Sequence, residues 1–348
     1  ATTTERNDGP SSTKADASQA SQGMMALFAL PEPRDRERAA LPLGQVAGLR
    51  GKDGLRKDGL MTRIAYQGEP GAFSEAAARQ LAQHVDPLPC RAFEDVFAAV
   101  NDGTVEFGVL PIENSIGGSI HRNFDLLQQH DLPIVAETEV PVVHHLLALP
   151  GVALDDIRRI YSHPQALAQC DRFLRALTGV EVTASYDTAG SAKMIASDRL
   201  LDAAAIASAR AGELFGLMPL RSSIQDFEHN VTRFLVVGRR PISQKPADKT
   251  SIVFTLPNEP GALFKALSVF ALRGIDLTKL ESRPVPGRRW EYMFYVDLAA
   301  SPEQPPCARA LAHLGEFAPI LRVLGSYASC RPTAAAPAAT RRRSMRFT

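Results

Sequence analysis

Residues 224–238 are the stretch around which the rest of the chain is organised. They contain, in order, Ile224-Gln225-Asp226, Asn230-Val231-Thr232-Arg233-Phe234 and Leu235-Val236-Val237-Gly238. Apolar and β-branched residues fill its second half and a glycine closes it, which predicts a polar turn leading into a short buried strand. Where turn becomes strand, a hydroxyl, a guanidinium and an aromatic ring are adjacent. Such loop–strand junctions hold small ligands in many α/β proteins. Taken alone, however, these residues are more typical of an ordinary strand end, because threonine favours strands and an arginine at a strand end is usually solvated.

Composition excludes several classes of function. The 348 residues are 45% apolar and 22% charged, which is typical of a soluble globular protein with two or three domains. The net charge of +1 excludes the basic field of a nucleic-acid binder. The longest apolar run, Val142 to Leu149, is far shorter than the ~20 residues of a membrane span. We therefore expect neither a nucleic acid nor a membrane as partner.

The cysteines and the missing motifs narrow the chemistry. Four cysteines lie far apart with no C-x-x-C pair, which argues against a disulfide framework or a zinc site and fits a reducing compartment. No H-E-x-x-H, nucleophile elbow, Walker loop or strand-following G-x-G-x-x-G is present. The consecutive His144 and His145 point to opposite sides of a strand, so they do not share a metal. We therefore predict no metal, no cofactor, and chemistry on a small polar acid.

Periodicity predicts two α/β lobes followed by a third unit. Residues 1–62 lack sustained periodicity and are interpreted as a disordered leader or spacer. Residues 63–141 alternate strands and helices, as in a mainly parallel sheet, and 225–240 return to this first lobe. Residues 142–224 form the second lobe, and two crossings between the lobes leave a cleft. Residues 250–328 read as β-α-β-β-α-β, a ferredoxin-like domain, and 329–348 as a disordered basic tail.

Other polar clusters stand at predicted element ends, each with two interpretations. Glu113-Asn114-Ser115 either terminates a strand or belongs to a site, and Gly117-Gly118-Ser119 either caps the next helix or forms an anion site. His163, before Pro164, is interpreted as an N-cap rather than a proton donor. Asp187-Thr188 is interpreted as a cap rather than a catalytic acid.

Taken together, these blocks resemble the prephenate dehydratase family, including plant and algal arogenate dehydratases. The resemblance rests on Thr232-Arg233-Phe234 with the blocks before it, and covers about residues 63–328. The third unit is similar to a phenylalanine-sensing ACT domain. The other matching blocks, in family order, are Glu113-Asn114-Ser115, Gly117-Gly118-Ser119, Ser162-His163-Pro164-Gln165, Asp187-Thr188-Ala189, Ala205-Ile206-Ala207, Pro260-Gly261-Ala262-Leu263 and Glu281-Ser282-Arg283-Pro284.

The resemblance implies a fold and a reaction. It implies a two-lobed catalytic domain like that of periplasmic binding proteins, and loss of water and carbon dioxide from arogenate or prephenate. Thr232 matches the family's catalytic threonine, Arg233 either holds a substrate carboxylate or braces the site, and Phe234 supplies an apolar wall. The candidate substrate-binding residues are Asn114, Ser115, Ser162, Gln165, Thr188 and Asn230.

The resemblance also implies regulation and assembly. Phenylalanine is expected at the ACT domain, between subunits of a homo-dimer or homo-tetramer. Its expected ligands are Asn258, Gly261, Ala262 and Leu263 together with Glu281, Ser282, Arg283 and Pro284. The similarity of several sequence blocks to plant arogenate dehydratases favours arogenate as substrate and a chloroplast location. Prephenate dehydratase proper and a non-catalytic amino-acid-sensing binding protein remain the alternatives.

Overall fold

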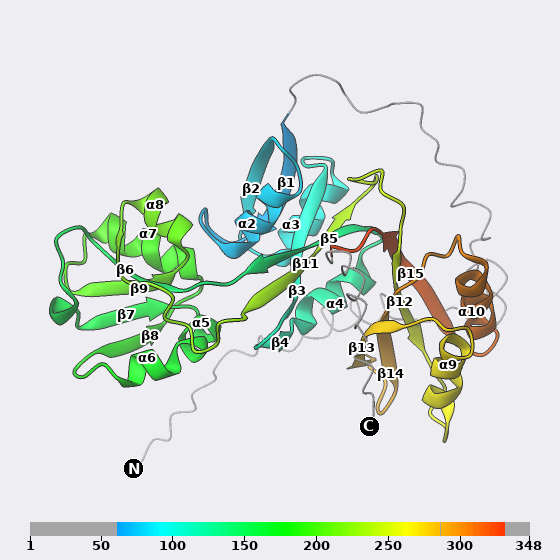
Figure 1. Ribbon diagram of the computed structural model, residues 1–348. Helices are drawn as coiled ribbons and strands as arrows, with labels where there is room; N and C mark the ends of the chain where they lie inside the picture. The colour runs from blue at the N-terminus through cyan, green and yellow to red at the C-terminus, as the bar shows by residue number, and fades with distance from the viewer. Residues whose placement is uncertain (1–60, 286, 331–348) are drawn as a thin grey trace, which may run out of the picture. The chain divides into compact units, whose positions relative to one another are not determined.

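The computed structural model describes residues 61–285 and 287–330, which fold around three separate β-sheets (Figure 1). The expected leader and tail lie outside these residues except at their inner ends. There Thr62 already belongs to the first strand, and Ser329 binds the Asp248 carboxylate. None of the helices in the described part of the chain is long and apolar enough to cross a bilayer.

The first sheet belongs to lobe one and is mixed rather than mainly parallel. Its order is β2-β1-β3-β11-β5, with the short β4 paired to β3. Strands β2 and β3 run parallel to β1, whereas β11 lies antiparallel to both neighbours because it enters from the second lobe. The bounds are β1 (Thr62–Gln67), β2 (Val85–Cys90), β3 (Phe107–Asn114), β4 (Gly118–Ser119), β5 (Ile134–Pro141) and β11 (Val231–Gly238).

Helices α2 (Phe73–Gln80), α3 (Phe93–Asn101) and α4 (His121–Gln129) pack on this sheet. In α3, Val96, Phe97 and Val100 are buried, as the helical spacing of these apolar residues requires. Strand β11 is almost wholly buried between β3 and β5, so the segment from Thr232 to Gly238 lies in the interior of lobe one.

The second sheet forms lobe two, in the order β10-β6-β9-β7-β8. At its centre β9 is built only of alanine and isoleucine and is completely buried, which lets the flanking helices pack closely. The strands are β6 (His145–Ala148), β7 (Arg159–Ser162), β8 (Glu181–Ala184), β9 (Ala203–Ala207) and β10 (Met218–Arg221). The helices are α5 (Pro164–Gln169), α6 (Asp171–Arg175), α7 (Thr188–Asp198) and α8 (Ala209–Phe215), with a 3₁₀ turn at Leu154–Asp156.

The third sheet has the order β13-β14-β12-β15, and its connectivity is β-α-β-β-α-β. The expected ferredoxin-like fold is therefore confirmed. Its core lies between the sheet and the two helices. The elements are β12 (Lys249–Thr255), α9 (Ala262–Ala271), β13 (Leu277–Pro284), β14 (Tyr292–Leu298), α10 (Pro305–Gly315) and β15 (Ile320–Tyr327).

Candidate active site

A cleft of about 100 Å³ is lined by residues from both lobes. Thr232 lies on its wall, at the start of β11. The lining combines apolar groups with short polar ones and contains no lysine or arginine. Its residues are Phe73, Asn114, Val142, His144, His163, Gln165, Ala166, Gln169, Thr188 and Thr232.

Asn114 orients the hydroxyl of Thr232. The two residues lie opposite each other in the β3–β11 pair, and Asn114 Nδ2 donates to Thr232 Oγ1 over 3.0 Å. The backbone N–H groups of Ile116 and Gly117 donate to Asn114 Oδ1, so the amide group can face Thr232 only with its nitrogen. Because Oγ1 accepts this bond, the threonine proton remains available for donation into the cleft.

Three amide side chains close a ring of hydrogen bonds across the lobes. Asn114 Nδ2 donates to Asn230 Oδ1 at 2.7 Å, and Asn230 Nδ2 donates to Gln169 Oε1 at 2.8 Å. Gln169 Nε2 completes the ring by donating to Asn114 Oδ1 at 3.3 Å. All three side chains are buried. The ring therefore joins the ends of β3 and β11 in lobe one to α5 in lobe two.

The segment at residues 224–226 forms hydrogen bonds with the backbone of two cleft residues, His144 and Gln169. Gln225 Oε1 accepts from the backbone N–H of His144, and the backbone N–H of Asp226 donates to the Gln169 carbonyl at 2.7 Å. The polar turn predicted from the sequence thus holds the backbone of His144 and Gln169 in place.

His144 is a neutral donor in this arrangement. Its Nε2 lies 2.9 Å from Gln169 Oε1, which already acts as an acceptor, so the network assigns the proton to Nε2. Its Nδ1 is buried and finds no partner within the described part of the chain. Burial lowers the pKa of the imidazole, against the opposing effect of the Gln169 hydrogen bond. The edge of the ring packs on Phe73 at 5.6 Å between centroids.

His144 gives a pH prediction for stability. Because its folded-state pKa lies below the ordinary 6.5, the unfolded chain binds more protons as the pH falls through that value. The folded state therefore loses stability as the pH drops from 7 to 5.5. The variant His144→Gln keeps a donor nitrogen and will show a smaller fall in Tm. It will not lose the fall entirely, since burial also lowers the pKa of His130, His145 and His163. Equal pH slopes in the two proteins would contradict this role.

Lobe two brings two capped helix starts to the cleft. His163 Nδ1 accepts from the Gln165 N–H, and Asp187 Oδ1 accepts from the Gly190 N–H, so both are N-caps as expected. Burial raises the pKa of Asp187 and lowers that of His163. Gln165 and Thr188, on the first turns of these helices, line the cleft. A Cβ at Gly117 would overlap Gln165 Nε2, so the Gln165 side chain keeps its present position in the cleft only beside a residue without a side chain.

Two of the predicted substrate ligands have backbone partners instead of facing the cleft. Ser162 Oγ is fully buried and donates to the Ile206 carbonyl at 2.6 Å. Ser115 Oγ donates to the His229 carbonyl and accepts from the Val231 N–H. Neither serine lines the cleft, whereas Asn114, Gln165 and Thr188 do. Asn230 lies directly behind Asn114 in the amide ring.

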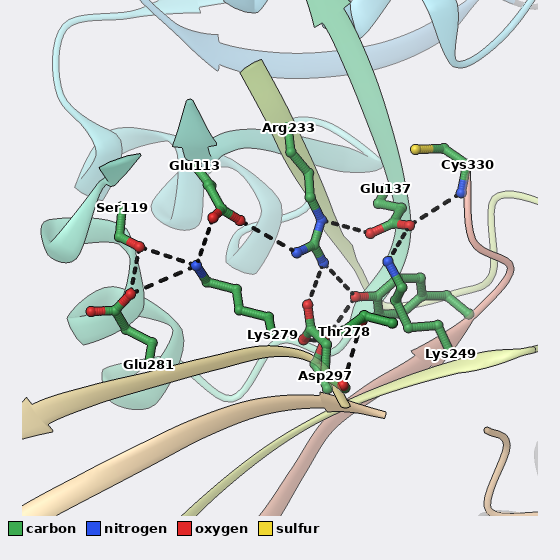
Figure 2. A network of polar contacts seen from close by, with 12 residues as sticks. Glu113, Ser119, Glu137, Arg233, Lys249, Thr278, Lys279, Glu281, Asp297 and Cys330 are labelled. Atoms are coloured by element: carbon green, nitrogen blue, oxygen red, sulfur yellow. Dashed lines mark hydrogen bonds and ion pairs between the residues drawn. The ribbon is translucent and has the colours of Figure 1, made fainter. Parts of the chain in front are cut away.

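Phe234 and Arg233 also lie away from the cleft lining. Phe234 is buried in the core of lobe one, with Ile64, Val109 and Val236. Because successive side chains of a strand point to opposite faces, Arg233 points away from Thr232. Its guanidinium meets the Glu137 and Asp297 carboxylates at 2.7 and 2.6 Å (Figure 2). Of the two roles expected for Arg233, these contacts favour bracing.

The predicted effector residues fall into two groups within the ACT domain. Asn258 and Gly261 are exposed in the loop before α9, where Gly261 has a φ of 81°. Ala262 is buried, and Leu263 packs on the domain core. Asn258 and Gly261 therefore belong to an exposed loop, whereas Ala262 and Leu263 form the start of α9.

The second group alternates along β13. Glu281 accepts a hydrogen bond from Ser119 Oγ, and Arg283 pairs with Asp125 at 2.9 Å, so both side chains face lobe one. Ser282 and Pro284 lie on the exposed side of the strand. The structure thus does not gather all four residues on one face.

Several cleft residues escaped sequence reasoning. Gln169 and Phe73 lie on α5 and α2, which were expected, but neither belongs to a polar cluster at a strand end. His144 was expected on a strand with His145, but it lies in the segment between β5 and β6. Gln169 follows Gln165 by one helical turn, and this i, i+4 spacing is the only signal that pointed toward the same face. Within the described residues, no group of His, Cys, Asp and Glu has a metal-binding arrangement.

Comparison with known proteins places this cleft in a family. The prephenate dehydratase family model matches residues 64–242, and the ACT domain model matches 250–310. Arogenate dehydratase/prephenate dehydratase 2, chloroplastic, of Arabidopsis thaliana is 51% identical over 281 residues, covering 78% of this chain and 74% of that protein.

Two solved structures are similar over most of their length. The prephenate dehydratase of Arthrobacter aurescens in complex with L-Phe is 34% identical, with a TM-score of 0.71, and covers 79% of this chain and 93% of that one. A protein described as GqqA, a novel type of quorum quenching acylase, is 40% identical, with a TM-score of 0.69, and covers 77% and 98%. With its catalytic-domain model matched over more than half its length, this chain belongs to the prephenate dehydratase family and carries a C-terminal ACT domain.

Proposed function

We propose that this protein is an arogenate dehydratase that converts L-arogenate to L-phenylalanine, with some conversion of prephenate to phenylpyruvate. The observation that carries the proposal is the Thr232 hydroxyl, which lies in the cleft with its oxygen held by Asn114 and its proton free. The plant relative named for both substrates supports this choice and a chloroplast location.

The chemistry demands little covalent work from the protein. Arogenate is a cyclohexadiene with a ring carboxylate and a ring hydroxyl, and their joint loss forms an aromatic ring. The enzyme must orient the substrate and assist the departing hydroxide. The Thr232 hydroxyl donates a hydrogen bond to that leaving oxygen and keeps its proton. The Asn114 bond on Oγ1 strengthens the donation, because hydrogen bonds in a chain polarise one another.

The departing carboxylate meets the apolar part of the cleft. Phe73, Val142 and Ala166 line it, and no cationic side chain among the lining residues stabilises the carboxylate charge. A poorly solvated carboxylate loses carbon dioxide more readily, because its charge disperses as the bond breaks. Gln165 and Thr188, whose polar groups also line the cleft, bind the substrate's side chain in this proposal.

Turnover of arogenate and prephenate, measured side by side with phenylalanine and phenylpyruvate as products, tests the function. We expect both to be consumed, with the higher kcat/KM for arogenate. A higher value for prephenate would make the protein a prephenate dehydratase proper. Consumption of neither would overturn the enzyme and favour the amino-acid-sensing protein instead.

Phenylalanine is the proposed effector, bound at the ACT turn around Gly261. We expect it to raise the Tm, since a ligand that binds only the folded state stabilises it. Gly261→Ala will weaken this shift because alanine is strained at a φ of 81°. Gly274→Ala is the matched control, at a φ of 65° in the same domain but beyond the far end of α9. Equal shifts in the two variants would contradict the assignment.

A homo-dimer or homo-tetramer is the proposed assembly. Phe264 and Leu272, on and next to α9, leave 76% and 84% of their surface exposed and are therefore available to contact a second copy of the chain. Light scattering of the full chain, with and without phenylalanine, measures its mass. A monomer under both conditions would overturn this part of the proposal.

A further inference from the structure

The two strands that form the site carry a second pair of residues on their reverse face. Thr232 pairs with Asn114 across β11 and β3, and the next pair is Arg233 with Glu113. Because successive side chains of a strand point to opposite faces, Arg233 and Glu113 lie directly behind the cleft pair. Any force on this rear pair therefore acts on the backbone that holds Thr232.

The ACT domain binds one member of the rear pair through Asp297. Its Oδ2 lies 2.6 Å from Arg233 Nη2, while Ser251 donates to its other oxygen at 2.6 Å. Within lobe one, Glu137 accepts from Arg233 Nε at 2.7 Å and also pairs with Lys249 of the ACT domain at 2.6 Å. Only 13% of the Arg233 side chain is exposed, so water screens these charges weakly.

The ACT domain binds the other member through Lys279. Its Nζ lies 3.1 Å from Glu113 Oε1, 3.1 Å from Ser119 Oγ and 3.6 Å from Glu281 Oε2. Figure 2 shows the Lys279 ammonium among these three oxygen-bearing groups, with Arg233 between Glu113 and Glu137. The Lys279 side chain is 9% exposed and also lies over the Phe124 ring. These contacts together fix the position of the Lys279 ammonium group.

These contacts restrict position more than they add stability. Buried ion pairs lose much of their attraction to desolvation, but their directional hydrogen bonds fix the groups they join. Here the fixed groups are the chain neighbours of Asn114 and Thr232. A hydrogen bond of 3.0 Å between those two, and the aim of the hydroxyl, depend on the strand register that the rear pair holds.

We infer that Lys279 and Asp297 of the ACT domain are positioning residues for Thr232, acting through Glu113 and Arg233. These four residues form the ionic clamp. The inference rests on the proposed function, because it assigns the Thr232 hydroxyl a part in turnover. Neither ACT residue contacts the cleft, so the clamp affects the geometry of the reacting group and leaves substrate binding unaltered.

Two substitutions test the clamp. Lys279→Met removes the ammonium and keeps the chain length, and Asp297→Asn removes the charge and keeps the shape. We expect kcat to fall about 10- to 100-fold, the range for a small misplacement of a reacting group, with KM within about twofold of wild type. Lys279→Arg keeps the cation and will retain most of the rate.

Arg322→Met is the matched control. Arg322 also joins the ACT domain to lobe one, through the Gln128 and His130 carbonyls and the Asp131 carboxylate, but not behind the site. Its kcat will match the wild type. If Asp297→Asn fails to fold, as judged by its melting curve, Lys279→Met decides the question, because Glu113 is 38% exposed and remains hydrated without its partner.

The decisive readout is the same substitution in a Thr232→Ala background. If the clamp acts through the hydroxyl, Lys279→Met will lower kcat no further there. An unchanged kcat in the single variant, or an equal fall in both backgrounds, would overturn the clamp while leaving the proposed function intact. A wild type that consumes neither substrate overturns the proposed function and the clamp with it.

Discussion

Thr232→Ala will fold normally and lose about 10²- to 10³-fold in kcat. This is the range for removal of one preorganised hydrogen-bond donor from a developing oxyanion. The hydroxyl lies in the cleft, its oxygen accepts from Asn114, and its proton is the one available at the leaving group. The loss appears in kcat rather than KM, because the bond to a departing hydroxide forms only as it departs.

Thr232→Ser is the matched control for this variant. It keeps the hydroxyl and removes only a methyl group, so most of the rate will remain. Circular dichroism and the melting curve will confirm that both variants fold, since one lost hydrogen bond alters stability by only about 1 kcal/mol. Wild-type kcat in Thr232→Ala would remove the hydroxyl from the mechanism.

Asn114→Asp is the second large expected effect. The change is isosteric, but it replaces the amide nitrogen, which donates to Thr232 Oγ1 and Asn230 Oδ1, by an oxygen. The Thr232 proton will then turn toward the new carboxylate and away from the cleft. A negative charge there also opposes the departing hydroxide. We expect kcat to fall by about 10²-fold or more, on the scale of a lost oxyanion donor.

The variant will also be less stable, because the buried Asn230 Oδ1 loses its donor and faces another oxygen, at a cost of about 1–3 kcal/mol. Ser115→Ala, at the next residue, is the control. The Ser115 hydroxyl contacts backbone outside the cleft lining, so its removal will leave kcat near wild type. A larger loss of kcat in Ser115→Ala than in Asn114→Asp would contradict the arrangement of the site.

Much of the fold could be predicted from local sequence patterns. The buried strand ending at Gly238, the alanine strand at residues 203–207 and the caps at His163 and Asp187 all follow from composition and from hydrogen-bonding capacity near the residue itself. By contrast, β2 contains two prolines and lacks clean alternation, so nothing local identified it as a strand. The antiparallel position of β11 depends on a chain return of almost a hundred residues after β5, which no local pattern encodes.

The cleft residues that could be predicted lie at strand ends or on the first turns of helices. Asn114 and Thr232 lie at strand ends, Gln165 and Thr188 lie at helix starts, and all four line the cleft. The amide ring was not predicted, because its members lie far apart in sequence. Gln169 is 61 residues from Asn230 and 55 residues from Asn114. Nor could a single sequence decide whether the Arg233 side chain faces the cleft or the opposite side of the strand. Alternation allows both arrangements, and the Asp297 partner that holds Arg233 comes from the distant ACT domain.

The most direct test of the account is the product balance of the wild-type enzyme with arogenate. Carbon dioxide and phenylalanine are measured in the same reaction, beside Thr232→Ala. Concerted loss of water and carbon dioxide at Thr232 predicts one carbon dioxide for each phenylalanine from the first time point, with both falling together in the variant. Carbon dioxide released ahead of phenylalanine, or phenylalanine formed equally fast by Thr232→Ala, would contradict it.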